Sequence, residues 1–484
     1  MPVSTPATSP DPAARYRIAR MARWDLIAET RPSLNSWNHT YHRRLEAVYR
    51  WLIPPGRRVL EVGCGFGDLL AALSPAEGVG VDFSPAMIAG ARSRHPQIAF
   101  VEADAHELPL STSFDYVILS DLVNDLWDVQ QVLQQVQRVT HPGTRVIINV
   151  YSHLWELPLA IAKRMGAASP LLEQNWLTVP DIAGLLALTG FDVVRRWQEL
   201  LCPLGVPGVE PLANRVAVKS WPFNLAAMSN FIAARPAPDV KPRPPRPSVS
   251  VVVPARNEAG NIESIFERLP RMGGGTEIVF AEGHSRDDTF GAIERAIAAH
   301  PDRPCVLLRQ TGEGKANAVR EAFARATGDI LMILDADLTV APEDLPRFYD
   351  AIGSGRGEFI NGVRLVYPME DQAMRLLNLL GNKFFSLLFS WLLDQPIKDT
   401  LCGTKVLWRR DYERLVEGRA YFGDFDPFGD FELLFGAAKL TLRIVEVPIR
   451  YRQRTYGETN IQRWKHGWLL LKMSAFAARR LKWV

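Results

Sequence analysis

A proline-dense stretch at residues 234–247 divides the chain into two halves of comparable length. Prolines at this density favour extended polyproline geometry and interrupt both helices and paired strands. The chain has 484 residues, which is more than one hydrophobic core usually serves. A proline-rich surface loop within one domain is the alternative, but a new strand is predicted directly after the stretch. We therefore predict a domain at 1–234, a semi-rigid linker at 235–247 and a second domain at 248–484.

Short apolar runs alternate with helix-length segments in both halves. In the first half, Val129, Val132 and Val136 follow helical spacing, and Ser84-Pro85 is typical of an N-cap followed by proline. This alternation predicts a parallel sheet with helices on both faces, and the second half predicts a further α/β domain. The predicted strands are 58–62, 78–82, 98–102, 114–119 and 145–150 in the first half, and 249–253, 277–280, 306–308 and 330–334 in the second.

Charge and cysteine content exclude several classes of protein. The formal net charge of +3 is too small to indicate a nucleic-acid partner. The four cysteines are scattered without the spacing of metal ligands or disulfides, which indicates a reducing compartment. The N-terminus lacks the pattern of a signal peptide, and no uninterrupted apolar run reaches the roughly eighteen residues of a spanning helix. We therefore expect a cytoplasmic protein whose membrane contact is peripheral, at the inner face.

A glycine-rich turn follows the first predicted strand, with Gly63, Gly65 and Gly67 at alternate positions. Glycines let the backbone turn tightly and approach a ligand closely, and the helix that follows supplies amide donors. In the dinucleotide fingerprint the third glycine comes one residue later, and here Glu61 precedes the turn. Both departures disfavour NAD. The turn therefore indicates a different nucleoside cofactor.

Two aspartates end the next two predicted strands. Asp82 is placed to accept hydrogen bonds from both hydroxyls of a ribose, and Asp104 is placed to meet the amino group of an adenine. With the glycine turn and the strand at 114–117, they follow an order that resembles the class I S-adenosylmethionine-dependent methyltransferases over residues 61–150. A degenerate Rossmann domain kept as a scaffold is the alternative. The resemblance implies a Rossmann-like domain that binds S-adenosyl-L-methionine through Glu61, Gly63, Gly65, Gly67, Asp82 and Asp104.

The methyl acceptor site is less defined by the sequence. Asp121, Asn124 and His153 follow the fourth and fifth predicted strands, at the edge where α/β sheets bind their ligands. Each is a candidate general base, and each is also compatible with a structural hydrogen-bonding role. The residue types alone do not choose among the three.

The second half also carries polar groups at the ends of its predicted strands. Asp335 and Asp337 follow the strand at 330–334, where alternate aspartates can bind one divalent cation such as Mg²⁺ or Mn²⁺. Such a cation neutralises the charge of a departing diphosphate. The loop around Lys315 fails the Walker pattern, because Lys315 is followed by Ala316. These groups predict a site for a metal-bound diphosphate and not a phosphate-binding P-loop.

The order of these motifs resembles the family 2 glycosyltransferases with the GT-A fold, over residues 248–460. The resemblance assigns a metal to Asp335 and Asp337 and a catalytic role to Asp337. Ala281-Glu282 stands where the family usually has paired aspartates, so the nucleobase stays open. The implied nucleotide-sugar site comprises Pro254, Arg256, Asn257, Glu258, Glu282, Lys315 and Asp335.

The C-terminal segments narrow the resemblance to dolichyl-phosphate mannose synthase-like enzymes. By that resemblance Asp430 is a catalytic base or an acceptor-site acid, Arg454 contacts a phosphate, and the acceptor is a polyprenyl phosphate. A surface acid at a helix start is the alternative for Asp430. Arg364 is either a further phosphate contact or a plain surface ion pair. The matching segments are 399–405, 430–433, 446–449 and 454–460, although Thr459-Asn460 replaces the usual Ser-Lys.

Two C-terminal helices combine apolar and polar faces. Such helices suit the lipid headgroup layer, and a core helix with a solvated basic face explains the same pattern. The family resemblance favours peripheral contact with a membrane surface. The polar stripe of the helix at 376–393 comprises Arg375, Asn378, Asn382, Ser386 and Ser390, and the last helix carries Lys465, Lys472 and Arg479 with Trp464, Trp468 and Leu471 toward another side.

Together these motifs predict a bifunctional enzyme of cell-envelope glycolipid or polysaccharide assembly. The N-terminal half transfers methyl from S-adenosyl-L-methionine, and the C-terminal half transfers a sugar from a nucleotide-sugar to a polyprenyl phosphate. Two alternatives stay open. The glycosyltransferase acts on a soluble sugar or polysaccharide acceptor, or the N-terminal half is a non-catalytic docking module.

Overall fold

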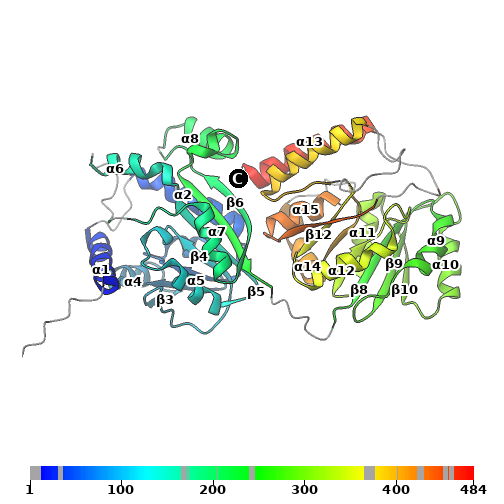
Figure 1. Cartoon of the computed structure of the whole chain (residues 1–484), viewed down its shortest axis with the longest axis horizontal. Coiled ribbons are helices and arrows are strands. Elements are labelled where there is room, and N and C mark those ends of the chain that lie inside the picture. Colours follow the sequence, from blue (N-terminus) through cyan, green and yellow to red (C-terminus); the bar gives the residue numbers. More distant parts are fainter. Residues whose placement is uncertain are drawn as a thin grey trace, which may run out of the picture. The chain divides into compact units, whose positions relative to one another are not determined.

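The computed structural model of the chain describes residues 12–30, 36–164, 172, 174–203, 205–238, 246–364, 376–400, 402–421, 430–450, 456 and 463–483. The chain forms two compact units (Figure 1). One comprises residues 1–237 with 483–484, and the other comprises 238–482. Each unit is built on its own sheet with its own hydrophobic core.

The described residues of the N-terminal unit include a seven-stranded sheet in the order β3-β2-β1-β4-β5-β7-β6. β1 to β5 are parallel to one another, and β7 runs antiparallel between β5 and β6. This confirms the α/β class, although β6 and β7 lie outside the predicted strands. The strands are β1 (Arg58–Val62), β2 (Glu77–Asp82), β3 (Ala99–Glu102), β4 (Phe114–Ser120), β5 (Thr140–Tyr151), β6 (Phe191–Glu199) and β7 (Ser229–Pro236).

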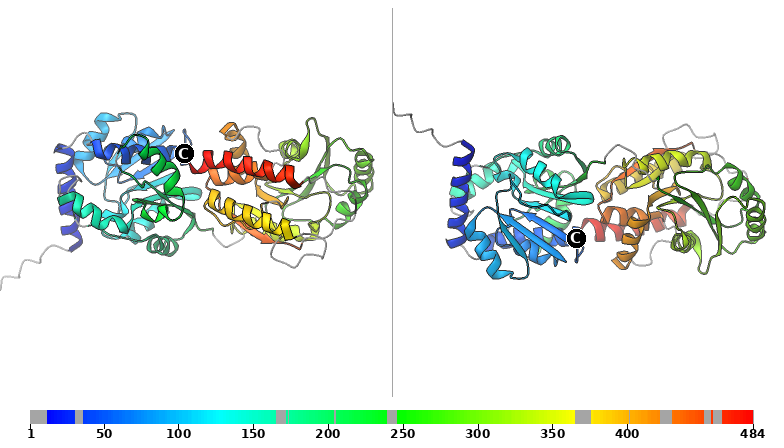
Figure 2. Two further views of the ribbon diagram at one scale, coloured as in Figure 1. Left: turned by 90° about the horizontal axis from the view of Figure 1, so that it is seen from above. Right: turned by 90° about the horizontal axis from the view of Figure 1, so that it is seen from below.

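Helices cover both faces of this sheet, as the alternation predicts (Figure 2). One core cluster packs α5 and α7 on the sheet, and another packs α2 on it. Ser84 is the N-cap of α4, and its Oγ accepts the backbone N–H of Met87 at 3.2 Å. The helices are α1 (Pro12–Thr30), α2 (Ser36–Leu52), α3 (Asp68–Ala72), α4 (Pro85–Arg94), α5 (Val129–Arg138), α6 (Glu156–Arg164), α7 (Val179–Leu188) and α8 (Val209–Pro211), with the short turns η1 (Val123–Asp125), η2 (His153–Trp155), η3 (Leu212–Val216), η4 (Ala217–Lys219) and η5 (Phe223–Ala226).

The C-terminal boundary of the N-terminal unit differs from the prediction. Arg235 and Pro236 were expected in the linker but complete β7, where they pair with Asp192 and Phe191 of β6. A proline is tolerated there because it is the last residue of the strand. At the start of the unit, α1 begins at Pro12. Proline fits the first turn of a helix, whose N–H groups have no partner within the helix.

The C-terminal unit, within its described residues, also has a seven-stranded sheet, in the order β10-β9-β8-β11-β13-β12-β14. β13 runs antiparallel to β11 and β12, and the other neighbours are parallel. The strands are β8 (Val249–Ala255), β9 (Thr276–Glu282), β10 (Cys305–Arg309), β11 (Ile330–Ile333), β12 (Phe359–Val363), β13 (Lys405–Trp408) and β14 (Ile444–Pro448). Their helices are α9 (Ile262–Arg268), α10 (Thr289–Ala299), α11 (Gly314–Arg325), α12 (Leu345–Gly353), α13 (Leu376–Leu393), α14 (Arg409–Glu417), α15 (Asp430–Lys439) and α16 (Arg463–Ala477).

Helix α13 confirms the predicted span and runs beside α16 (Figure 2). Two serines of α13 form hydrogen bonds within the unit. Ser386 Oγ donates to the carbonyl of Ile397 at 2.6 Å, and Ser390 Oγ accepts the Ile397 N–H at 2.9 Å. Phe384 and Leu387 are exposed instead. On α16, Trp468 is exposed with the Lys472 ammonium 5.7 Å from its ring centroid. Among the described helices, none has the length and apolar character that crossing a bilayer requires.

Candidate active sites

The glycine turn after β1 has left-handed backbone at Gly63 and Gly65, with φ of 75° and 51°. A Cβ at Gly63 would lie 2.8 Å from Leu122 Cδ1, whereas a Cβ at Gly65 would meet nothing within 4 Å. Gly67 shares the left-handed backbone and packs against the ring of Phe100. The turn is therefore tight on its protein side and open at Gly65, where a ligand can approach the backbone.

Asp82 ends β2, Asp104 follows the neighbouring strand β3, and both line one pocket. Asp82 accepts the Gly65 N–H at 2.9 Å and the Ser84 N–H at 3.0 Å, which ties the strand end to the glycine turn. Burial raises the pKa of Asp82. The structure thus brings together these two predicted cofactor residues and Gly63 at one edge of the sheet.

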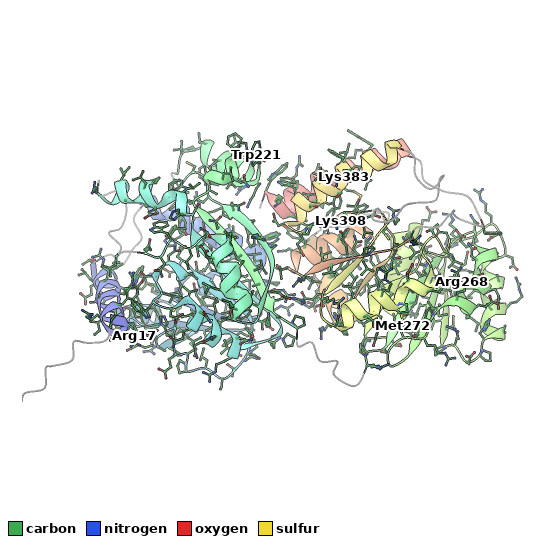
Figure 3. All side chains as sticks on the ribbon, in the orientation of Figure 1. Arg17, Trp221, Arg268, Met272, Lys383 and Lys398 are labelled. Carbon is green, nitrogen blue, oxygen red and sulfur yellow. The ribbon has the colours of Figure 1, made fainter. Side chains whose placement is uncertain are left out.

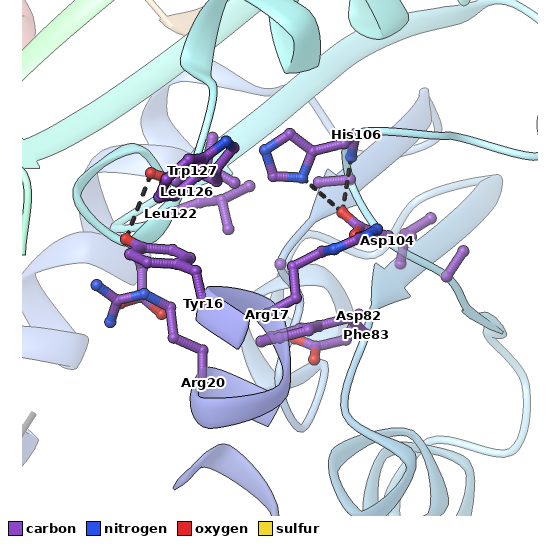
Figure 4. Close-up of a pocket in the computed structure, with 15 residues that line it drawn as sticks. Tyr16, Arg17, Arg20, Asp82, Phe83, Asp104, His106, Leu122, Leu126 and Trp127 are labelled. Carbon is purple, nitrogen blue, oxygen red and sulfur yellow. Dashed lines mark hydrogen bonds and ion pairs between the residues drawn. The ribbon is translucent and has the colours of Figure 1, made fainter. Parts of the chain in front are cut away.

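Asp104 is held by two partners within this pocket (Figure 4). Its Oδ1 lies 2.6 Å from His106 Nδ1, and its Oδ2 accepts from Arg17 at 3.0 Å. Partial burial opposes ionisation, but the hydrogen bonds from His106 and Arg17 hold the pKa of Asp104 well below its usual range. The carboxylate is therefore ionised and keeps acceptor capacity for a bound ligand.

Helix α1 forms one wall of the pocket, which the sequence analysis missed. Tyr16, Arg17 and Arg20 line the space, and Arg20 pairs with Asp125 at 2.5 Å. A basic residue in a polar N-terminal segment gives no signal of its partner, since the paired acids lie far along the chain. The lining comprises Tyr16, Arg17, Arg20, Gly63, Val81, Asp82, Phe83, Ala103, Asp104, Ala105, His106, Leu122, Asp125, Leu126 and Trp127.

Glu61 lies near the end of β1 and is buried. Burial raises the pKa of Glu61 to about 8. Oε2 of its carboxyl group has no hydrogen-bond partner among the described residues. A buried oxygen without a partner is costly, so this atom is suited to a donor on a ligand.

The three candidate bases lie in different surroundings. Asp121 follows β4 with a left-handed φ of 55°, and its Oδ1 accepts from Tyr41 OH and from Asn149 Nδ2, both at 2.6 Å. Burial raises the pKa of Asp121 to about 7. Asn124 is instead buried in backbone contacts, and exposed His153 lies 3.6 Å from Glu156. Of the three, Asp121 alone combines a strained backbone with a buried polar network.

The first two strand ends of the C-terminal unit form a hydrogen-bonded turn. Ala255 pairs with Glu282 in the sheet, so the turn after Pro254 and the acid lie at one edge. Asn257 has a left-handed φ of 59° and accepts the Arg286 N–H at 2.7 Å, while Glu282 accepts the Ser285 N–H at 2.6 Å. Glu258 is buried and accepts from Asn261, and Arg256 is exposed. Among these residues, Arg256 offers an exposed charged side chain to a donor.

Positive charge surrounds the first acid of the Asp-Ala-Asp turn. Lys315 Nζ lies 2.7 Å from Asp335 Oδ1, so the lysine loop and β11 meet. Burial opposes ionisation, but Lys315, Lys405 and Arg364 together hold the pKa of Asp335 below its usual range. Lys405 is fully buried, and its ammonium donates to the carbonyl of Cys402. Lys405 ends the segment 399–405 that carries the family resemblance, and no role was predicted for it.

Asp337 turns toward its own loop, where Oδ1 accepts from Thr339 N at 3.1 Å and from Thr339 Oγ1 at 2.8 Å. In the part of the chain that the structure describes, no three or more His, Cys, Asp or Glu side chains converge as metal ligands. Two carboxylates of one turn, with a diphosphate adding oxygens, still fit a hard divalent cation. The metal site at Asp335 and Asp337 stays a prediction.

Arg364 forms an ion pair in this structure, and its predicted phosphate contact stays a prediction. Its guanidinium binds Asp399 through two bonds of 2.7 and 2.8 Å, and Asp399 is buried. The expected surface ion pair is therefore a buried pair, with 11% of the Arg364 side chain and none of the Asp399 side chain exposed. The side chain of Asp430 and all of Arg454 lie outside the described residues.

Family models match both units. Residues 53–186 match a methyltransferase domain, and residues 250–415 match glycosyl transferase family 2. A probable S-adenosylmethionine-dependent methyltransferase of Mycobacterium tuberculosis is 35% identical over 215 residues, covering 41% of this chain and 75% of that protein. The match of the N-terminal half therefore covers most of the length of that relative.

The second half is similar to archaeal sugar transferases. A dolichyl-phosphate hexose transferase of Haloferax volcanii is 30% identical, covering 44% of this chain and 86% of that protein. A dolichol-phosphate mannosyltransferase of Pyrococcus furiosus is 29% identical, covering 49% of this chain and 64% of that protein. The chain spans less than two thirds of the length of some curated relatives that it matches. By these matches the chain belongs to the S-adenosylmethionine-dependent methyltransferases through its N-terminal unit and to the family 2 glycosyl transferases through its C-terminal unit.

Proposed function

We propose that the chain is a bifunctional enzyme with one active site in each unit. The pocket shared by Asp82, Asp104 and Gly63 carries the proposal for methyl transfer. The ion pair between Lys315 and Asp335 at the end of β11 carries the proposal for transfer of a sugar from a nucleotide-sugar. In each unit the polar groups gather at the carboxyl ends of parallel strands, where α/β sheets bind their ligands.

The pocket of the N-terminal unit fits S-adenosyl-L-methionine. Asp82 would receive the ribose hydroxyls and Asp104 the adenine amino group. The unpartnered Oε2 of Glu61 would accept from the ammonium group of the methionine part. When bound, this cofactor supplies an electrophilic methyl group. The open side of Gly65 leaves room for the ligand beside the backbone.

Asp121 would act as the general base of this unit. It would take the proton of an acceptor hydroxyl as that hydroxyl is methylated. Its pKa of about 7 favours this role, because a base works best when its pKa lies near the working pH. Tyr41 and Asn149 orient the carboxylate through Oδ1, and no described residue hydrogen-bonds to Oδ2. Oδ2 is therefore the atom that would meet the acceptor.

The basic cluster of the C-terminal unit would stabilise the departing diphosphate. Lys315, Lys405 and Arg364 all act electrostatically on Asp335, and fixed charges of this kind favour charge that develops in the transition state. Asp335 and Asp337 would hold Mg²⁺ or Mn²⁺ against the same diphosphate. The turn from Pro254 to Glu258, with Glu282, would hold the nucleoside.

A polyprenyl phosphate is the proposed sugar acceptor, reached by peripheral contact at the inner face of a membrane. The names of two relatives refer to dolichyl phosphate, and Phe384, Leu387 and Trp468 are exposed on α13 and α16. Arg454 would bind the acceptor phosphate, and Asp430 would lie in the acceptor site. An ionised phosphate is itself a nucleophile, so the transfer would need no base.

Two measurements on the full-length protein test the proposal. Calorimetry should show S-adenosyl-L-methionine binding that Asp82→Ala weakens at least tenfold, while Asp337→Ala leaves it unchanged. Sugar transfer from a panel of nucleotide-sugars to undecaprenyl phosphate should require Mn²⁺ or Mg²⁺ and should be lost in Asp337→Ala. Retained metal-dependent transfer in Asp337→Ala would refute the metal assignment. Absence of cofactor binding would favour a docking module, and turnover of water-soluble acceptors alone would favour a soluble acceptor.

A further inference from the structure

An exposed apolar surface lies on the N-terminal unit. It comprises Leu154, Leu157, Leu212, Trp221, Phe223 and Leu225, here called the apolar rim. Trp221 is 80% exposed, Leu157 70% and Phe223 56%. Water is an unfavourable surrounding for apolar side chains of this size. Gathered apolar side chains on a protein surface mark an interaction site.

Two segments carry the apolar rim, and a hydrogen bond joins them. Leu154 and Leu157 belong to η2 and α6, and the other members lie between Leu212 and Ala226. Trp155 Nε1 donates to the carbonyl of Ala226 at 2.9 Å. In Figure 1, α6 and α8 lie along the same upper side of the unit, and Figure 3 labels Trp221 there. The rim is therefore one surface.

The sheet topology places the apolar rim beside the proposed acceptor site. β5 ends at Tyr151, directly before η2, and Tyr151 pairs with Ser229 at the start of β7. Ser229 also pairs with Glu199 at the end of β6, so the segment between Glu199 and Ser229 starts and ends at this edge. Ser120 of β4 pairs with Asn149 of β5, which puts Asp121 at the same edge.

The charges near the apolar rim suit lipid headgroups. In the described residues 205–226, the exposed charged side chain is Arg215, and Arg164 is exposed at the end of α6. Glu156 at the start of α6 is also exposed, and its carboxylate lies 3.6 Å from His153. Glu210 is held by Arg43 at 3.5 Å and by Asn214 at 3.3 Å. An aromatic and aliphatic surface with exposed arginines matches the boundary between headgroups and acyl chains.

We propose that the apolar rim docks the N-terminal unit on the surface of a phospholipid bilayer. This contact is separate from the one proposed for α13 and α16 of the C-terminal unit. A unit docked in this way presents the Asp121 edge of its sheet to lipids. The inference rests on the proposed methyltransferase activity only where it takes the Asp121 edge as the acceptor site. Docking itself is measured without enzymatic turnover.

Co-sedimentation of the full-length protein with vesicles of phosphatidylcholine and phosphatidylglycerol tests the proposal. The parent protein carries Phe384→Ser and Leu387→Ser, which weakens binding through the C-terminal unit. Trp221→Ser should then lower vesicle affinity at least tenfold, equivalent to about 1.4 kcal/mol at 25 °C. Leu188→Ser is the matched control, since Leu188 is 73% exposed in the same unit but ends α7, at the opposite edge where β6 begins.

Each result bears on the proposal. Loss of vesicle binding in Trp221→Ser, with unchanged binding in Leu188→Ser, supports it. Equal vesicle affinity of Trp221→Ser and Leu188→Ser overturns it. Absence of vesicle binding by the parent protein, whether or not the wild-type protein binds, also overturns it. A change of oligomeric state in Trp221→Ser by light scattering, without a change in vesicle binding, assigns the rim to a second copy and also overturns it. Calorimetry with S-adenosyl-L-methionine reports separately whether the proposed cofactor site has failed.

Discussion

Replacing Gly65 by alanine should separate cofactor binding from folding. The residue has a left-handed φ of 51°, and a Cβ there meets nothing within 4 Å. A left-handed alanine costs about 1–2 kcal/mol, and the reduced freedom of the unfolded chain offsets about 0.4–1 kcal/mol of it. We therefore expect a loss of about 1 kcal/mol, which lowers Tm by about 2–4 °C in a domain of this size. The new methyl group would fill the space into which the cofactor is proposed to fit.

The expected loss in cofactor affinity is at least tenfold, or about 1.4 kcal/mol. Gly56→Ala is the matched control, since Gly56 has a φ of 75°, also has nothing within 4 Å, and precedes β1 at the other end of that strand. Both variants should lose similar Tm in a thermal melt without ligand. Titration calorimetry with S-adenosyl-L-methionine should show weakened binding in Gly65→Ala only. Unchanged affinity in Gly65→Ala would mean that the open side of the turn is not the ligand side.

Three further predictions concern single side chains. Asp121→Asn should slow methyl transfer by about 10²–10⁴-fold at unchanged cofactor affinity. The wild-type rate should fall below about pH 7 as Asp121 takes up a proton. A pH–rate profile without this decrease contradicts the role of Asp121 as general base. Lys315→Ala should slow sugar transfer by about 10²–10³-fold, measured as release of the nucleoside diphosphate, and normal turnover would remove Lys315 from the site. Asp399→Asn leaves Arg364 buried without its carboxylate and should destabilise the C-terminal unit by about 3–5 kcal/mol. Scanning calorimetry should show one unfolding transition at a lower temperature, with cofactor binding unchanged. An unshifted transition argues against a stabilising role for the Arg364–Asp399 pair.

The sequence by itself determined the features that depend on neighbouring residues. An apolar run followed by Gly63, Gly65 and Gly67 specifies a strand and a tight turn, because each requirement is met within a few residues. The same holds for Ser84 as the N-cap of α4 and for the span of α13. Strands that alternate with helices also place Asp82 and Asp104 at one edge of a sheet, since parallel strands end on the same side.

Tertiary structure decided which distant residues join these motifs. Arg17 meets Asp104 across 87 positions, and Tyr41 meets Asp121 across 80, so no local pattern announces either pair. Burial then sets the chemistry, since it raises the pKa of Asp121, while a buried Asp399 holds Arg364 inside the fold. Periodicity and turn chemistry act over a few residues, whereas desolvation and ion pairing depend on where the folded chain brings distant residues together. For this reason the strand ends and the glycine turn could be predicted from the sequence, whereas the partners of Asp104, Asp121 and Arg364 could not.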